Sequence, residues 1–211
     1  MNRTGILLNA RLQSTRLPKK HLLKVNQKPI FLYLLERVLN EFKKEITNKE
    51  VIVIIASSDI PENRELEIFC NNGIEIYYGS VDNVPLRHKQ VSLEFNLDYI
   101  ISLDGDDIFS SIEGMRKVYE GLQGGEKYVK TVNLPLGMNV NGYSSQFLAQ
   151  SLNGYEDIPL EMGWGRIFDE NILKSVFLNF VYPSSVPSES LRFTLDYEED
   201  FKFFKKIIKI C

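Results

Sequence analysis

The stretch GILLNARLQSTRLPKK, residues 5–20, joins an apolar run to a basic loop. The run at residues 5–9 has the composition of a strand that is buried on both faces of a parallel sheet. The cations of the loop are Arg11, Arg16, Lys19 and Lys20. Ligands of open α/β sheets bind at the carboxyl ends of the strands, where Arg and Lys neutralise several phosphate oxygens at once. The stretch therefore predicts a phosphate-binding loop, with a solvated basic loop as the alternative.

Strand patterns and helix patterns alternate along the rest of the chain. The strands are predicted at residues 5–9, 51–56, 74–78, 99–103, 128–133 and 191–195. The helices are predicted from Pro29 to Phe42, from Pro61 onward, and at 84–95, 112–122, 144–152 and 198–210. Because strands that alternate with helices form parallel crossovers, we expect a three-layer α/β/α fold with a mostly parallel sheet.

Length and composition limit the class of protein. The chain has 211 residues, of which 44% are hydrophobic, and no linker divides it, so we expect a single domain over residues 1–211. A net charge of −3 argues against a general nucleic-acid binder, because such proteins present a broad basic surface. A small anionic ligand fits one basic loop better.

Cysteine use and hydropathy predict a location in the cytoplasm. Cys70 and Cys211 are the only cysteines, which supports neither a disulfide framework nor a cysteine metal site. The first strand is expected within about five residues of the start, which leaves no room for a signal peptide. No apolar run approaches the ~18 residues of a membrane helix. We therefore expect a soluble protein with no membrane partner.

Acidic residues follow two of the predicted strands. Asp104, Asp106 and Asp107 come directly after the strand at 99–103, and Asp196 follows the strand at 191–195. Mg²⁺ takes one or two protein carboxylates and completes its shell with phosphate and water. If the two strands are neighbours, Asp106 and Asp196 can hold one metal ion. The alternative is a turn with helix caps, which are common roles for Asp.

The middle of the chain, at about residues 134–182, is interpreted as an irregular acceptor-binding segment. Residues 134–143 and 153–168 are rich in Gly, Pro, Asn and aromatic side chains, which suits a pocket wall. Arg166 is a candidate anion clamp, Trp164 a stacking surface and Glu161 an acceptor for hydroxyl groups. The alternatives are a core or dimer anchor for Trp164 and an ion pair between Arg166 and Glu161 or Asp169.

Four blocks of the sequence resemble the cytidylyltransferases that activate sugars, including the CMP-Kdo synthetases and the spore coat polysaccharide biosynthesis proteins. ARLQSTRLPKK at 10–20, continuing to 38, is similar to that family's opening A-R-x-x-S-T-R-L-P-G-K. The other three blocks are IIASSDIPENREL at 54–66, GSVDNVPLRHKQ at 79–90 and LRFTLDYEEDFKFFKKI at 191–207. They occur in the family's order, so the resemblance spans most of the chain.

The resemblance implies a Rossmann-like, GT-A-like fold of the nucleotide-diphospho-sugar transferases. It also implies CTP and Mg²⁺, transfer of CMP to a sugar acid or a sugar or polyol phosphate with release of pyrophosphate, and a role in surface polysaccharide biosynthesis. A homodimer built partly from the middle segment is implied too. By matching motifs, Arg11, Arg16 and Lys20 would hold the triphosphate, and Asp106 and Asp196 the metal. The implied nucleotide contacts are Asn9 and Ala10 at the cytosine edge, with Ser14, Lys19, Arg87 and Asp104.

The chain departs from the family pattern at three places. Lys19 stands where the family has a glycine, so either the loop bends differently or Lys19 adds a fourth positive charge. The turn at 105–109 lacks the family's proline, and the middle segment does not match a sugar-acid pocket. These departures leave two rivals: a metal-dependent glycosyltransferase that uses Asp104–Gly105–Asp106 as a D-x-D motif, and a catalytically silent nucleotide-binding subunit. We interpret His88, beside Arg87, as solvated on a helix surface in preference to a nucleotide contact.

Overall fold

A computed structural model describes residues 2–71, 73–168, 174–177 and 191–210. Its centre is a seven-stranded sheet with the order β5-β4-β1-β6-β8-β7-β9. The strands are β1 Thr4–Asn9, β4 Val51–Ser58, β5 Ile74–Gly79, β6 Tyr99–Asp104, β7 Tyr128–Val132, β8 Asn141–Ser144 and β9 Lys174–Phe177. A separate small hairpin joins β2 Lys24–Val25 to β3 Lys28–Pro29.

The sheet is mostly parallel, as predicted. Strands β5, β4, β1 and β6 run parallel, and β9 runs parallel to β7. Strand β8 lies between β6 and β7 and is antiparallel to both. The central strand β1 is buried on both faces, which explains its unbroken apolar run.

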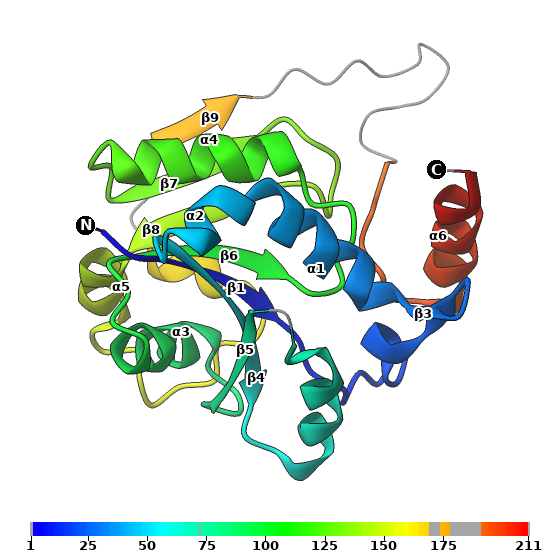
Figure 1. The fold of residues 1–211 in the computed structure, drawn as a ribbon. Coiled ribbons are helices and arrows are strands. Elements are labelled where there is room, and N and C mark those ends of the chain that lie inside the picture. The colour runs from blue at the N-terminus through cyan, green and yellow to red at the C-terminus, as the bar shows by residue number, and fades with distance from the viewer. Residues whose placement is uncertain (1, 72, 169–173, 178–190, 211) are drawn as a thin grey trace.

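Helices cover both faces of the sheet, which confirms the three-layer α/β/α fold (Figure 1). The longer α-helices are α1 Ile30–Glu41, α3 Val84–Glu94, α4 Ile112–Gln123, α5 Ser145–Leu152 and α6 Glu198–Ile210, and α2 Lys43–Thr47 is short. The 3-10 turns are η1 Lys20–Leu22, η2 Pro61–Phe69 and η3 Trp164–Ile167. One core packs α1, α4 and α6 against Ile6 and Leu8 of β1, and the other packs α3 and α5 against Leu7. None of the helices in the described ranges combines the length and apolar composition that crossing a bilayer needs.

The structure differs from two predictions about elements. Residues 191–195 form no strand, because Arg192 makes only an isolated bridge, to Leu136, and the Leu195 N–H donates to the Asp106 carbonyl in the turn after β6. The middle segment is not irregular throughout, because β8, η3 and β9 form there in addition to the predicted helix α5. Residues 169–173, which include Asp169, and residues 178–182 of that segment lie outside the described residues.

Candidate active site

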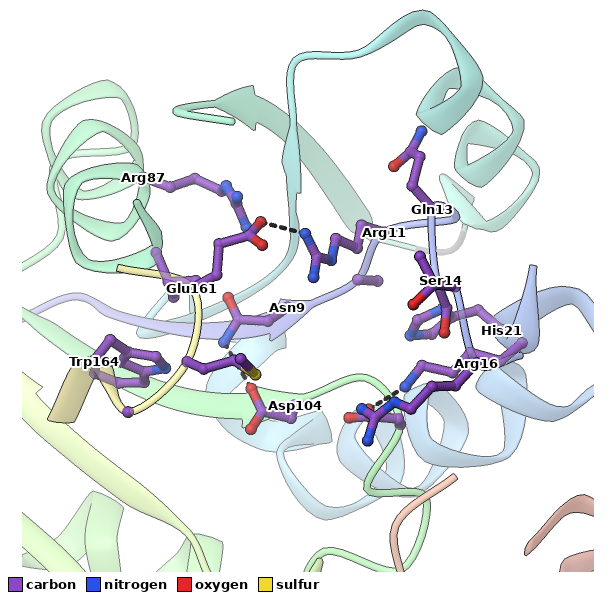
Figure 2. A pocket seen from close by; sticks show the side chains of 17 residues that line it. Asn9, Arg11, Gln13, Ser14, Arg16, His21, Arg87, Asp104, Glu161 and Trp164 are labelled. Atoms are coloured by element: carbon purple, nitrogen blue, oxygen red, sulfur yellow. Dashed lines mark hydrogen bonds and ion pairs between the residues drawn. The ribbon is translucent and has the colours of Figure 1, made fainter. Parts of the chain in front are cut away.

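A cleft of about 860 Å³ opens at the carboxyl ends of β1 and β6 (Figure 2). In the sheet, Asn9 is the register partner of Asp104, so the loop after β1 and the turn after β6 start side by side. Most predicted site residues line the cleft: Asn9, Ala10, Arg11, Ser14, Arg16, Lys20, Arg87, Asp104, Asp106, Glu161 and Trp164. Asp196 joins them through its contacts with Arg16 and Lys20.

Asn63 of η2 fixes the conformation of the basic loop by hydrogen bonds. The buried Asn63 side chain accepts a hydrogen bond from the Leu12 backbone N–H at 2.9 Å and donates to the Ser58 carbonyl at 2.9 Å. The Leu12 carbonyl in turn accepts from the Lys19 backbone N–H at 3.1 Å. Asn63 is therefore a support of the site that the charge pattern did not reveal, although it lies in the second matched block.

Lys20 joins the two predicted metal ligands. Its ammonium group contacts Asp106 Oδ2 and lies 3.2 Å from Asp196 Oδ1, with the lysine side chain only 9% exposed. Arg16 Nη2 also donates to Asp196 Oδ1, at 2.7 Å. The two carboxylates therefore contact the same ammonium group, even though residues 191–195 form no strand.

Lys19 turns away from the cleft. It is not a lining residue, and its Nζ lies 2.6 Å from Glu65 Oε1 of η2, with both side chains about half exposed. Its backbone is left-handed, with φ 51° and ψ 32°, the conformation that glycine adopts without strain. The loop thus keeps the bend that the family glycine suggests. The prediction that Lys19 binds the nucleotide is not supported by its position.

In the acidic turn after β6, desolvation and neighbouring carboxylates disfavour the ionised form of two aspartates. Partial desolvation at the cleft floor, and then Asp106 nearby, raise the pKa of Asp104 to about 6. Burial, and then Asp104 and Asp106 nearby, raise the pKa of Asp107. Carboxylates that resist ionisation in this way gain from a bound cation.

Opposite the acidic turn, Glu161 lies between two arginines. Arg11 Nη1 contacts Glu161 Oε1, and Figure 2 shows Arg87 reaching toward the same carboxylate from α3. Burial lowers the pKa of Arg87 to about 10, and its guanidinium donates to the Ser80 and Val81 carbonyls at 2.9 and 3.2 Å. Arg87 therefore stays charged at neutral pH and anchors the loop after β5.

The other residues predicted for the acceptor differ in position. Trp164 lines the cleft and also packs edge-on against His88, with ring centroids 5.5 Å apart, so it serves the core as well. Arg166 is exposed and outside the cleft lining, which does not support its predicted role as an anion clamp. Glu161 pairs with Arg11, so the alternative pair with Arg166 is wrong.

His88 is not solvated, contrary to our interpretation. It is fully buried, with ring nitrogens 2.6 Å from Asn9 Oδ1 and 2.5 Å from the Tyr143 hydroxyl. Helical spacing places it on the face of α3 that packs against the sheet, because its neighbours Val84 and Val91 are buried on that face too. That spacing was the sequence signal for its burial.

Comparisons with known proteins agree with this geometry. A profile of the family described as "Cytidylyltransferase" matches residues 5–157. The spore coat polysaccharide biosynthesis protein SpsF of Bacillus subtilis is 27% identical over 214 residues, covering 98% of this chain and 87% of SpsF. A cytidylyltransferase structure from Leptospira borgpetersenii superposes with a TM-score of 0.79 at 22% identity, covering 100% of this chain and 88% of that one.

A third similar structure is a CMP:2-keto-3-deoxy-manno-octonic acid synthetase complexed with CTP. It superposes with a TM-score of 0.70 at 14% identity, covering 99% of each chain. At such identities the two solved structures establish only a shared nucleotidyltransferase fold. The profile, by contrast, covers well over half of the sequence, including the loop after β1 and the acidic turn after β6. The chain therefore belongs to the cytidylyltransferase family.

Proposed function

We propose that this protein transfers CMP from CTP to a sugar acid or to a sugar or polyol phosphate, with release of pyrophosphate. The observation that carries the proposal is the cleft itself, where Arg11, Arg16 and Lys20 face the acidic turn at the carboxyl ends of β1 and β6. Three cations beside a carboxylate pair suit a triphosphate with a divalent cation. A transferase of finished sugar nucleotides handles a diphosphate and needs fewer cations.

The carboxylate pair of Asp106 and Asp196 fits a magnesium ion. Both side chains contact one ammonium group, that of Lys20, so their oxygens already surround one cation position. In the described ranges, no three His, Cys, Asp or Glu side chains gather around a metal position, which suits an ion that completes its shell with phosphate and water. When bound there, Mg²⁺ would neutralise charge on the phosphates.

The remaining chemistry is positioning and charge neutralisation by the chain's own residues. An acceptor oxygen attacks the α-phosphorus of CTP in line, the bond from that phosphorus to the β-phosphate oxygen breaks, and pyrophosphate leaves. Arg11, Arg16 and Lys20 act where negative charge grows on the phosphate oxygens. Each is paired with a carboxylate in the structure, which keeps its side chain ordered before the nucleotide replaces that partner. A phosphate acceptor is already ionised, whereas a sugar hydroxyl needs a base, for which Asp104 is placed.

The acceptor, the biological role and the assembly belong to the proposal as well. The similarity to SpsF, a spore coat polysaccharide biosynthesis protein, supports an acceptor from surface polysaccharide or glycan biosynthesis. Glu161 and Trp164 are the lining residues that we assign to the acceptor. Exposed Leu136 and Ile158, at 59% and 41%, lie in the segment proposed for a homodimer, which sedimentation velocity would test. A cytoplasmic location remains a prediction.

The test is incubation with CTP, Mg²⁺ and a panel of sugar acids and of sugar and polyol phosphates, with pyrophosphate release as the readout. The adjacent lysines provide matched variants, because Lys20 lies in the cleft and Lys19 outside it. We expect Lys20→Gln to lower kcat/KM by at least about a hundredfold, as for loss of one preorganised charge contact, and Lys19→Gln to leave it within about twofold.

Two results would replace the proposal by its rivals. Turnover of a nucleotide sugar without pyrophosphate release would identify a glycosyltransferase. Binding of CTP with Mg²⁺ that never progresses with any acceptor, and that persists in Asp196→Ala, would identify a silent nucleotide-binding subunit.

A further inference from the structure

A chain of four polar side chains runs from the buried side of the sheet to the cleft floor. The Tyr143 hydroxyl of β8 lies 2.5 Å from His88 Nδ1, and His88 Nε2 lies 2.6 Å from Asn9 Oδ1. Asn9 Nδ2 then donates to Asp104 Oδ1 at 3.3 Å and to Ser102 Oγ at 3.1 Å. Figure 2 shows the end of this chain, where Asn9 and Asp104 meet in the cleft.

Hydrogen-bond chemistry gives this chain one direction. The Asn9 amide nitrogen faces Ser102 Oγ and Asp104 Oδ1, so its amide oxygen faces His88. His88 Nε2 must therefore carry the proton that it donates to that oxygen. The other ring nitrogen is then bare and accepts from the Tyr143 hydroxyl. Every donor points toward the cleft, from Tyr143 through His88 and Asn9 to Asp104.

Burial keeps this arrangement fixed. Tyr143 and His88 are both fully buried, and burial, with Arg87 nearby, lowers the pKa of His88 to about 3. The imidazole is thus neutral at physiological pH and holds a single tautomer. Burial also raises the pKa of Tyr143, so that hydroxyl remains a donor.

The direction of these hydrogen bonds determines which hydrogen-bonding capacity Asn9 has left for a ligand. Both amide hydrogens are used, on Ser102 and Asp104, and one oxygen lone pair accepts from His88. The remaining capacity of this cleft-lining side chain is one oxygen lone pair. Asn9 can therefore accept a hydrogen bond from a ligand and cannot donate one. Cytosine presents an amino donor at its 4-position, whereas uracil presents an acceptor oxygen there.

We propose that His88 is a positioning residue for base selectivity, which holds the Asn9 amide so that it accepts from cytosine and rejects uracil. The proposal rests on the proposed function for the identity of the nucleotide, and on the family resemblance for the position of its base beside Asn9. It assigns His88 no contact with substrate, because its ring lies behind Asn9 and outside the cleft lining.

Two substitutions of His88 separate its two hydrogen bonds. In His88→Gln the side-chain nitrogen can take the place of Nε2 and donate to Asn9. In His88→Asn the shorter amide can take the place of Nδ1 and accept from Tyr143, but it does not reach Asn9. The dissociation constants of CTP and UTP, each with Mg²⁺, are measured by titration calorimetry for the wild type and both variants. Thermal unfolding verifies that the variants fold.

We expect the wild type to prefer CTP, His88→Asn to lower the CTP-to-UTP affinity ratio by about tenfold or more, and His88→Gln to keep it within about threefold. A merely structural role for His88 would weaken both nucleotides equally and leave the ratio unchanged in both variants. That result would overturn the proposal, as would equal loss of the ratio in the two variants.

A measurement on the wild-type protein alone determines the direction of the hydrogen bonds from Tyr143 to Asp104. His21 and His88 are the only histidines, so ¹⁵N spectra of the imidazole nitrogens are readily assigned with His21→Gln. We expect His88 to carry its proton on Nε2 and to remain neutral between pH 5 and 8. A proton on Nδ1 would overturn the proposal even if neither variant folds. If the wild type binds no CTP, the proposed function fails, and this measurement still decides the hydrogen-bond chain.

Discussion

Lys20 occupies the position that we assign to the divalent cation. Its ammonium contacts Asp106 and lies 3.2 Å from Asp196, and the lysine side chain is largely buried. A metal ion and this ammonium therefore compete for the same carboxylates until nucleotide phosphates draw Lys20 away. In Lys20→Gln, which removes the competing charge, we expect Mn²⁺ to bind at least about tenfold more tightly in the absence of nucleotide. Electron paramagnetic resonance of free Mn²⁺ measures this affinity.

The matched control for that experiment is Lys19→Gln, because Lys19 pairs with Glu65 outside the cleft. It should leave Mn²⁺ affinity unchanged. Weaker Mn²⁺ binding in Lys20→Gln would contradict the competition and indicate that Lys20 orients the carboxylates for the metal.

Gly105, in the turn after β6, lies tightly against the end of β1. Its N–H donates to the Asn9 carbonyl at 2.8 Å, and a Cβ on it would lie 2.8 Å from that carbonyl oxygen and 2.8 Å from His21 Nε2. We expect Gly105→Ala to lower the free energy of unfolding by about 1–3 kcal/mol, as for overpacking, and to weaken nucleotide binding because the acidic turn must move. Urea unfolding and calorimetry measure the two effects.

The comparison variant is Gly165→Ala, since a Cβ there meets nothing within 4 Å. Its unfolding free energy should change by less than about 0.5 kcal/mol. Equal unfolding free energies of the two variants would show that the turn at Gly105 accommodates a Cβ without loss of stability.

At the scale of residues, the sequence predicted which residues lie near the cleft better than it predicted which way their side chains point. Charge and motif together identified Arg11, Arg16 and Lys20, all of which line the cleft. The same signals could not separate Lys19 from Lys20, because a left-handed backbone at Lys19 turns adjacent side chains to opposite sides of the loop. Asn63 and His88 carry no charge signal, so their roles depend on contacts between elements.

Helix α6 positions Asp196 through its first turn. Asp200 accepts hydrogen bonds from the backbone N–H groups of Asp196 and Tyr197, at 2.9 and 2.8 Å, and from Arg192 at 3.1 Å. Burial alone would raise the pKa of Asp200, but these hydrogen bonds outweigh it and lower the pKa below its ordinary value. We expect Asp200→Ala to cost about 1–2 kcal/mol of unfolding free energy at pH 7, as for loss of a helix cap.

The pH dependence follows from that pKa. A carboxyl whose pKa is lower in the folded state stabilises the fold above its unfolded value and loses this effect as pH falls. The stability difference between wild type and Asp200→Ala should therefore shrink as pH falls below about 4. Glu198→Ala is the control, because its pair with Lys202 is exposed and worth a few tenths of a kcal/mol. A difference that is constant from pH 7 to pH 3 would contradict this account.

Elements with strong periodicity were predicted well, and elements that depend on distant partners were not. The predicted helices at 84–95, 112–122 and 198–210 match α3, α4 and α6 within one residue at each end. Strand β8 was missed because its short sequence NGYS has little strand character and is stabilised by pairing with both β6 and β7. The opposite error, at 191–195, arose because the apolar residues there pack into the core, as Leu195 does, while the segment makes only an isolated bridge and has no partner strand.

At the scale of the molecule, the site joins the two ends of the described chain. Arg16 and Lys20 follow β1, whereas Asp196 precedes α6, and their ion pairs join these two segments. Apart from the family's final block, the sequence indicated this closure only on the condition that the strands predicted before Asp106 and Asp196 are neighbours, because no local pattern shows that residues so far apart lie together. Bound nucleotide and metal would replace those ion pairs with a bridge through the cleft.

That bridge is testable by hydrogen exchange. With CTP and Mg²⁺ together, we expect amide exchange to slow both in the loop at 11–20 and in the first turn of α6, because both segments hold the same ligand. Helix α2 precedes the amino end of β4, away from the cleft, and its exchange should not change. CTP without a divalent cation should protect the loop and leave α6 unprotected, since Asp196 then has no metal to bind. Protection of the loop alone under both conditions would mean that Asp196 takes no part in the metal site.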